Sequence, residues 1–338
     1  DYYASRGLGD VYKRQESGYA SAVAKHLGTQ HTEEIISEKQ MLELVESIPQ
    51  YFDEPMADSS EIPTMLVSAL ARKQVTVALS GDGGDEFFCG YQMYRKLGQA
   101  QKLDAAGALV YGISQLPGLK QANLLGRLPF SVRTIAQNRD KRYKTQLCSD
   151  KYLACMKNLT GTDQVRFDRE LDYKVKNWQI RRMLLDMDTY LPGDILCKVD
   201  RASMKYSLEA RCPILDQRVM EYSFRLPHSF KDHNGCQKYI LKEIAYDYIP
   251  RELLDRKKTG FSVPLDKWLR GPLKNKLTDY ASPAFLKQQG LFNADATAKL
   301  ITDWLGAGDG GAYTGSNYSR IIWAFFIFQQ WAERYLQA

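Results

Sequence analysis

The sequence predicts an α/β protein with a parallel sheet flanked by helices in its first third and a mostly helical region after it. Between Glu16 and Gln101, helical and short strand patterns alternate, as they do where helices join parallel strands. The stretch from Val75 to Tyr91 reads as a strand, a glycine-rich turn and a helix. Residues 102–192 show helical or irregular patterns without strong strand alternation. We therefore expect the sheet to end before them.

Amphipathic spacing and turn residues set the boundaries of the elements in the first third. From Glu16, apolar residues recur every three and four positions up to Leu27, and Gly28 ends this helix. We expect the remaining elements, in order, to be a strand over 32–37, a helix over 38–48, a helix over 61–73 and a strand over 75–79. Residues 1–15 show neither helical nor strand periodicity, so we expect them to be a leader that is foreign or disordered.

The composition is that of an ordinary globular protein, with 338 residues, 44% hydrophobic and 25% charged. A formal charge of +6, spread along the chain, does not by itself indicate a nucleic-acid partner and is compatible with an anionic substrate, so we expect no nucleic acid. The longest apolar run, Ile321 to Phe328, is far shorter than the roughly 20 residues that span a bilayer, so no membrane association is expected. Six cysteines without a CxxC pair suggest reduced thiols, and no signal peptide is visible. We expect a cytoplasmic protein.

The glycine-rich turn after Leu79 has the composition of a ligand site. Three glycines between positions 81 and 84 permit backbone conformations that bring a ligand close to the main chain. The carboxylates of Asp82, Asp85 and Glu86 would repel a bare anion, which favours a metal-nucleotide or a reacting carbonyl. A turn capped by its own side chains is the alternative, and for a lone glycine-rich turn it is the more frequent one.

A second informative segment is the predicted helix that begins at Asp194. Spacings of four and three place Asp194, Lys198 and Arg201 near one face, with apolar residues on another. The alternative is a surface pair at i and i+4, which is worth only a few tenths of a kcal/mol.

Two loops add charged groups. The loop from Asp53 to Ser60 precedes a helix that Ser59 or Ser60 could cap, and we expect Asp58 to be an ordinary solvated residue. For Asp53, a solvated and a functional role remain equally open. The second loop places basic residues ahead of Thr259-Gly260, a pattern that suits an anion such as pyrophosphate, although most basic loops are simply solvated.

These segments together resemble the synthetase domain of glutamine-hydrolysing asparagine synthetases. The resemblance covers roughly residues 16–337, and several motifs in the same order are far more specific than any one of them. The matching stretches are Asp53-Glu-Pro-Met-Ala-Asp58, Ser80-Gly-Asp-Gly-Gly-Asp-Glu-Phe-Phe-Cys-Gly-Tyr91, Lys198-Val-Asp-Arg-Ala-Ser-Met204, Glu209-Ala-Arg-Cys-Pro-Ile-Leu-Asp216 and Arg256-Lys-Lys-Thr-Gly-Phe261.

The resemblance implies an ATP-pyrophosphatase fold, a five-stranded parallel sheet flanked by helices with a helical substrate region behind it. It implies that ATP and Mg²⁺ activate the side-chain carboxylate of aspartate as an acyl-adenylate, and that ammonia attacks this to give asparagine, AMP and pyrophosphate. The ammonia comes from glutamine in an N-terminal glutaminase domain. Whether the protein forms a homodimer is left open.

Site residues carry over from the resemblance position by position. Asp82 stands where some members have Glu, near the substrate ammonium and the attacking ammonia. Arg201, Glu209 and Arg211 are expected to be structural, in a buried ion network. The implied roles are ATP binding for Ser80 and Gly81, metal binding for Asp85, catalysis for Asp82 and Lys258, and substrate binding for Asp82, Asp194 and Lys198.

The sequence departs from the family because it contains no glutaminase domain and no Ser-Gly-Gly-x-Asp-Ser pyrophosphate loop, which in the family precedes the position of Glu16. We therefore expect a C-terminal fragment that is inactive in isolation. Its expected parts are the leader over 1–15, the C-terminal part of the nucleotide-binding sheet over 16–101, and a mostly helical remainder over 102–338.

Three other functions remain open at this stage. A related amidotransferase or cyclase on the same fold could act on a sugar acid, a peptide or a β-lactam precursor, because its chemistry is identical up to the adenylate. The chain could instead be a non-catalytic binding module. A nucleic-acid-modifying relative with the same sheet is a weaker alternative, since the expected cysteine or basic-patch features are missing.

Overall fold

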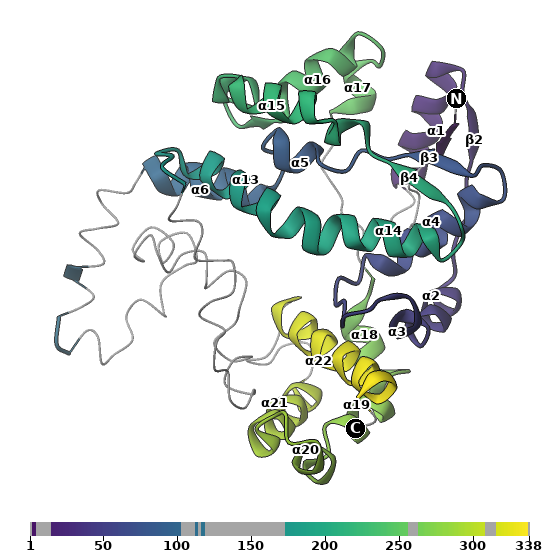
Figure 1. Cartoon of the computed structure of the whole chain (residues 1–338), viewed down its shortest axis with the longest axis vertical. Coiled ribbons are helices and arrows are strands. Elements are labelled where there is room, and N and C mark those ends of the chain that lie inside the picture. The colour runs from purple at the N-terminus through teal and green to yellow at the C-terminus, as the bar shows by residue number, and fades with distance from the viewer. Residues whose placement is uncertain are drawn as a thin grey trace.

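The structure, a computed structural model, describes residues 2–4, 15–102, 112–113, 116–118, 173–255, 263–307 and 316–336. Helices dominate these segments and short strands lie among them (Figure 1). Of the described helices, none is both long enough and apolar enough to cross a membrane.

The first hundred residues follow the predicted alternation. The helices expected over 16–27 and 61–73 are confirmed to within one residue, whereas the helix expected over 38–48 divides in two before Pro49. The elements are β1 (Tyr2–Ala4), α1 (Gln15–Leu27), β2 (Gln30–Thr32), α2 (Glu38–Val45), α3 (Ile48–Tyr51), α4 (Glu61–Arg72), β3 (Val77–Leu79), α5 (Gly84–Phe87) and α6 (Gln92–Lys102).

The second half is mostly helical. It holds α13 (Trp178–Asp188), the π-helix η3 (Leu191–Leu196), α14 (Cys197–Met204), β4 (Glu209–Arg211), the 3₁₀ turn η4 (Pro213–Leu215), α15 (Gln217–Arg225), the 3₁₀ turn η5 (His228–Phe230), β5 (Asp232–His233), β6 (Cys236–Gln237) and α16 (Tyr239–Tyr246). The last elements are α17 (Arg251–Leu254), α18 (Leu265–Arg270), α19 (Lys274–Tyr280), α20 (Pro283–Gln289), α21 (Ala294–Gly306) and α22 (Ser316–Tyr335).

Strand pairing corrects three expectations. The sheet does not end by Gln101, because β4 pairs in parallel with β3 in the register Val77↔Glu209. The strand expected over 32–37 lies at Gln30–Thr32 and pairs in parallel with β1, which falls inside the expected leader. Among the described residues the two parallel pairs and the antiparallel β5–β6 hairpin are separate two-stranded units. The five-stranded sheet implied by the resemblance therefore stays a prediction.

The largest apolar core joins the C-terminal helices to the helices before β3. Trp268, Trp304 and Trp323 are fully buried in it, and Phe52 and Ile62 enter it from the other side. Helix α14 crosses the middle of the molecule and packs along α4, with α15–α17 on one side and α18–α22 on the other (Figure 1). The helices that carry the charged segment at Asp194 are thus fixed between two packed regions.

The turn between β3 and α5 needs glycine at its second half. Gly83 has φ +89°, and a Cβ there would lie 2.5 Å from Cδ2 of Leu215. Only glycine accepts this combination of left-handed backbone and close approach without strain. The contact places η4, which follows β4, directly against the turn that follows β3.

Candidate functional site

The predicted nucleotide turn lies at the carboxyl end of the parallel pair. The backbone N–H of Ser80 donates to the carbonyl of Arg211 at 2.8 Å, which extends the ladder by one bond. The Ser80 hydroxyl donates to Asp82, and Cys212 Sγ lies 3.9 Å from the same carboxylate. A Cβ at Gly81 would meet no atom within 4 Å. Ser80, Gly81 and Asp82 are therefore together on a turn whose Gly81 is open to a ligand, as α/β folds place their ligands.

Asp85, the predicted metal ligand, belongs to an ion pair. Its Oδ1 lies 3.0 Å from Nζ of Lys238, and its carbonyl accepts a 2.8 Å bond from the N–H of Gly90. Because Lys238 already neutralises this carboxylate, a Mg²⁺ ion at Asp85 stays a prediction.

Glu86 faces the interior and begins a buried polar chain. It is fully buried, and the hydroxyl of Tyr91 donates to it at 2.6 Å. Burial raises the pKa of Glu86. The Tyr91 ring lies edge-on to Tyr190, with ring centroids 5.9 Å apart. Tyr190 directly precedes η3, so this chain joins the glycine turn to the helix that carries Asp194.

Lys198 is the centre of the second group of predicted residues. Its Nζ donates to Oδ2 of Asp58 at 2.6 Å and lies 3.9 Å from Oδ1 of Asp194. Asp58 also accepts bonds from the N–H and hydroxyl of Ser60, at 3.0 and 2.7 Å. The expectation that Asp58 is solvated is wrong, because α14 brings the lysine against the loop before α4.

The pKa values of the two aspartates move in opposite directions. Burial raises the pKa of Asp58, but the charge and hydrogen bond of Lys198 outweigh it and hold that pKa below its ordinary value. Burial and the charge of Asp58 raise the pKa of Asp194 to about 7. Lys198 thus stabilises one carboxylate, while its neighbour titrates near neutrality.

Glu61, which no motif singled out, lies beneath this pair. It is fully buried, and neither carboxylate oxygen has a hydrogen-bond partner. Burial, with the charges of Asp58 and Asp194, raises its pKa well above the ordinary value. In sequence, a glutamate in the first turn of a helix looks like a favourable interaction with the helix dipole, so its burial gave no signal.

The expected buried ion network of Arg201, Glu209 and Arg211 is wrong. Arg201 pairs with Asp53, and these side chains are 44% and 74% exposed. Arg211 pairs with Glu209 on its own strand at 2.7 Å, and both are more than half exposed. These are surface pairs of small energetic weight. Lys258 lies outside the described residues.

Two cavities border these groups. One, of 1020 Å³, has Asp58, Tyr190 and Asp194 on its wall, while Lys198 and Glu61 lie behind that wall. The loop that begins at Asp53 and the segment around Pro264 complete it. Its chemistry suits a ligand with a positively charged group, because five acidic residues line it against two arginines. They are Asp53, Glu54, Asp58, Asp194 and Asp266, with Arg201 and Arg320.

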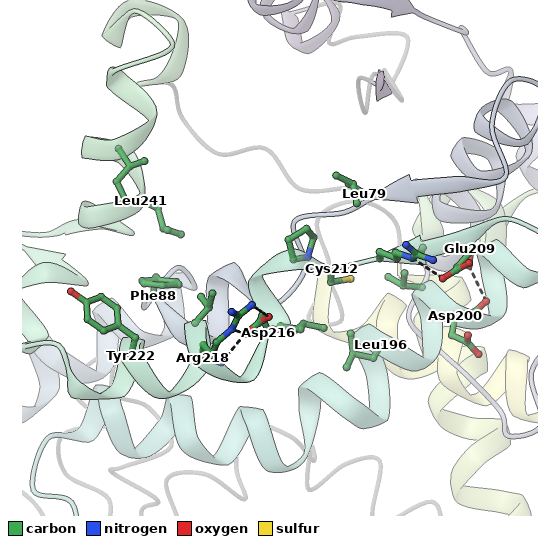
Figure 2. Close-up of a pocket in the computed structure, with 18 of the residues that line it drawn as sticks. Leu79, Phe88, Leu196, Asp200, Glu209, Cys212, Asp216, Arg218, Tyr222 and Leu241 are labelled. Carbon is green, nitrogen blue, oxygen red and sulfur yellow. Dashed lines mark hydrogen bonds and ion pairs between the residues drawn. The ribbon is translucent and has the colours of Figure 1, made fainter. Parts of the chain in front are cut away.

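The other cavity, of 1230 Å³, begins at the end of β3 and is lined mostly by apolar side chains. Figure 2 shows Leu79 and Cys212 at the strand ends, with Phe88 and Leu241 on other parts of the wall. Asp216 accepts hydrogen bonds from Arg218 at its margin. The apolar walls could hold a flat ring beside the glycine turn.

Comparison with known proteins gives a consistent set of relatives. A family described as asparagine synthase matches residues 5–333. The chain is 30% identical over 330 residues to asparagine synthetase [glutamine-hydrolyzing] 1 of Bacillus subtilis, covering 94% of the chain and 49% of that protein. It is 28% identical over 328 residues to a putative asparagine synthetase [glutamine-hydrolyzing] of Mycobacterium tuberculosis H37Rv, covering 94% and 48%. Amidase chry2 of Gibberella zeae is 22% identical over 311 residues, covering 83% and 46%. The chain spans about half the length of these relatives.

Proposed function

Because this chain belongs to the asparagine synthase family, we propose that it carries the synthetase chemistry of an ATP-dependent amide-forming ligase that converts aspartate to asparagine. The intermediate would be β-aspartyl-AMP, and the ammonia would derive from glutamine. An ATP-pyrophosphatase-type sheet is part of this proposal.

One observation carries the proposal: segments far apart in the sequence form one continuous polar wall. Glu86 bonds to Tyr91, Tyr91 packs on Tyr190, and Tyr190 leads into the helix of Asp194. A reaction that joins a nucleotide to an amino acid needs the nucleotide turn and an amino-acid pocket held at a fixed separation. This wall supplies that rigid connection.

In the first step, a carboxylate oxygen of aspartate would attack the α-phosphorus of ATP, and pyrophosphate would leave. The turn at Ser80 and Gly81 would hold the nucleotide, since Gly81 leaves room for close approach. The apolar cavity beside the turn could hold the base. Asp58, which Lys198 keeps ionised, would bind the ammonium group of aspartate.

In the second step, ammonia would add to the acyl carbonyl, AMP would leave, and the nitrogen would lose one proton. A carboxylate whose pKa is raised to about 7, as for Asp194, can take up a proton near neutrality. Asp82 lies on the nucleotide turn and is the second candidate for this transfer.

Because we expect the chain alone to be inactive, the test is AMP formation by the full-length protein with ATP, Mg²⁺ and either ammonium or glutamine. We expect AMP only when aspartate is present, and a loss of about 10²-fold or more in Asp194→Asn, as for removal of an acid–base group. A matched control is Asp303→Asn, whose carboxylate binds Lys299 on the surface of α21. AMP formation that does not depend on aspartate would rule the proposal out.

A related acceptor is the second candidate, because proteins named amidases align over most of the chain, although distantly. The same assay with sugar acids and peptides in place of aspartate separates the two. AMP formed with one of these acceptors and not with aspartate would favour the related amidotransferase or cyclase.

A further inference from the structure

Outside the wall described above, three side chains with metal-binding atoms meet on the far side of α5. Cys89 follows α5, His228 begins η5 and Asp232 begins β5, and one ligand atom from each lies within 4.8 Å of the other two. In the described part of the chain this is the only such group of three. It plays no part in the proposed synthetase reaction.

The backbone at Cys89 is unusual. Its φ is +60°, in the left-handed region that disfavours residues other than glycine by roughly 1–2 kcal/mol. The thiol is fully buried, and the Cys89 carbonyl accepts a 2.7 Å bond from Nε2 of Gln237. Strained residues held in place by their surroundings are concentrated at functional sites. Glycine would adopt this backbone conformation more easily, but it has no side chain, whereas Cys89 places its thiol in the cluster.

The other two ligands are oriented by hydrogen bonds. Asp232 accepts from the N–H of Gly235 at 3.1 Å and from Nε2 of Gln179 at 2.8 Å. His228 Nε2 lies 2.9 Å from Oε1 of Gln179, which fits a donor role for that nitrogen. His228 Nδ1 is buried and has no hydrogen-bond partner. A histidine fixed through one ring nitrogen, with the other nitrogen buried and unpartnered, is typical of metal sites.

We propose that Cys89, His228 and Asp232 form a binding site for a divalent cation of the Zn²⁺ type. Thiolate, imidazole and carboxylate are the donors that such ions prefer, whereas Mg²⁺ prefers oxygen alone. Binding would break the S–H bond of Cys89 and release that proton to solvent. Gln179, whose amide touches all three side chains, would orient these ligands from outside the metal's coordination shell.

Without a bound ion, Cys89 is a thiol. Burial and the charge of Asp232 raise its pKa to about 12, and the charge of Lys231, which is fully buried beside Cys89, lowers it only in part. The cation itself would therefore have to displace the thiol proton. With the thiolate and one carboxylate, the ion would be formally neutralised.

The bound ion would tie the end of the glycine-turn helix α5 to the η5–β5 segment. Cys89 lies two residues beyond Phe87, the last residue of α5, so the clamp would act at the end of α5 that is away from the nucleotide turn. We therefore expect the ion to stabilise the folded protein.

The experiment uses the whole chain, freed of metal with a chelator and titrated with Co²⁺ followed by optical absorption. We expect one equivalent bound, with a thiolate-to-cobalt charge-transfer band that Zn²⁺ displaces. Cys89→Ser should abolish the band, and His228→Gln should weaken binding at least tenfold. Cys236→Ser is the matched control, because this thiol lies in the neighbouring strand β6 outside the cluster.

Thermal unfolding supplies a second measurement. Zn²⁺ in excess should raise the Tm of the wild-type chain and of Cys236→Ser, and should raise the Tm of His228→Gln by less. A band that survives Cys89→Ser, or no band in the wild type, overturns the proposal. If Cys89→Ser fails to fold, equal Co²⁺ affinity of His228→Gln and the wild type overturns it equally.

Discussion

The ammonium group of Lys198 lies 2.6 Å from Oδ2 of Asp58, a residue 140 positions earlier in the chain. The bond joins α14 to the loop before α4, and the two helices pack along each other. The Oδ1 atom of Asp194 lies farther from the same ammonium group, at 3.9 Å, and has no hydrogen-bond partner. This asymmetry gives two aspartates on one cavity wall different protonation behaviour.

Removing Lys198 should destabilise the protein strongly. Lys198→Met would leave Asp58 as a mostly buried carboxylate without its cation, which costs about 3 kcal/mol. Urea unfolding at pH 7 measures it. The control is Lys267→Met, which removes a lysine that is 68% exposed from its pair with Glu38 and should cost less than about 1 kcal/mol. Equal losses for the two variants would contradict a special role for the Lys198 pair.

Glu61 should make stability depend on pH. Its folded pKa is raised above the ordinary value, so the folded state binds more protons than the unfolded state above about pH 4.5. Stability must therefore fall as pH rises from there towards the folded pKa. Glu61→Gln removes this ionisation, so we expect a smaller loss of urea-unfolding stability between pH 5 and pH 8.

The control for this comparison is Glu43→Gln, because Glu43 is mostly exposed. It should follow the wild-type pH slope. Asp194, with its pKa raised to about 7, contributes in the same direction, so some slope should remain in Glu61→Gln. A slope identical to that of the wild type would argue against a buried, protonated Glu61.

Tyr91→Phe should destabilise the turn helix α5. Glu86 would keep its burial but lose the 2.6 Å bond from the Tyr91 hydroxyl, which costs about 2 kcal/mol for a buried polar group. Thermal or urea unfolding measures the loss. Tyr335→Phe is the control, since that hydroxyl also donates one bond, to the carbonyl of Pro49, but its side chain is 46% exposed.

Gly90→Ala should disrupt the contact of Asp85 with Lys238. A Cβ at Gly90 would lie 2.0 Å from Oδ1 of Asp85 and 2.2 Å from Cε of Lys238, so both side chains must move. Overpacking of this kind costs about 1–3 kcal/mol. Gly193→Ala is the control, because its Cβ would meet nothing within 4 Å. If Gly90→Ala is as stable as the control, the side chains of Asp85 and Lys238 can move apart at little cost in free energy.

Several local elements of this protein could be predicted from the sequence alone. Apolar spacing predicted the bounds of α1, because a helix with one buried face needs an apolar residue every three or four positions, and the serines before Glu61, with Pro63 in the first turn, predicted those of α4. The turn at Gly83 was also visible, because a left-handed backbone calls for glycine wherever the chain later folds. The spacing predicted that Asp194, Lys198 and Arg201 lie near one face, and the structure shows Lys198 and Arg201 of that face paired with Asp58 and Asp53.

Only the tertiary structure decided which charges are buried and which strands pair. Asp58 looks like a solvated acid in sequence, yet it pairs with Lys198 of α14, and Glu61 is fully buried, since both outcomes depend on packing between segments far apart. Arg211 and Glu209 look like a core network, yet they lie on an exposed face of β4. The pairing of β3 with β4 spans more than a hundred residues, and a three-residue strand carries too little pattern to predict its partner.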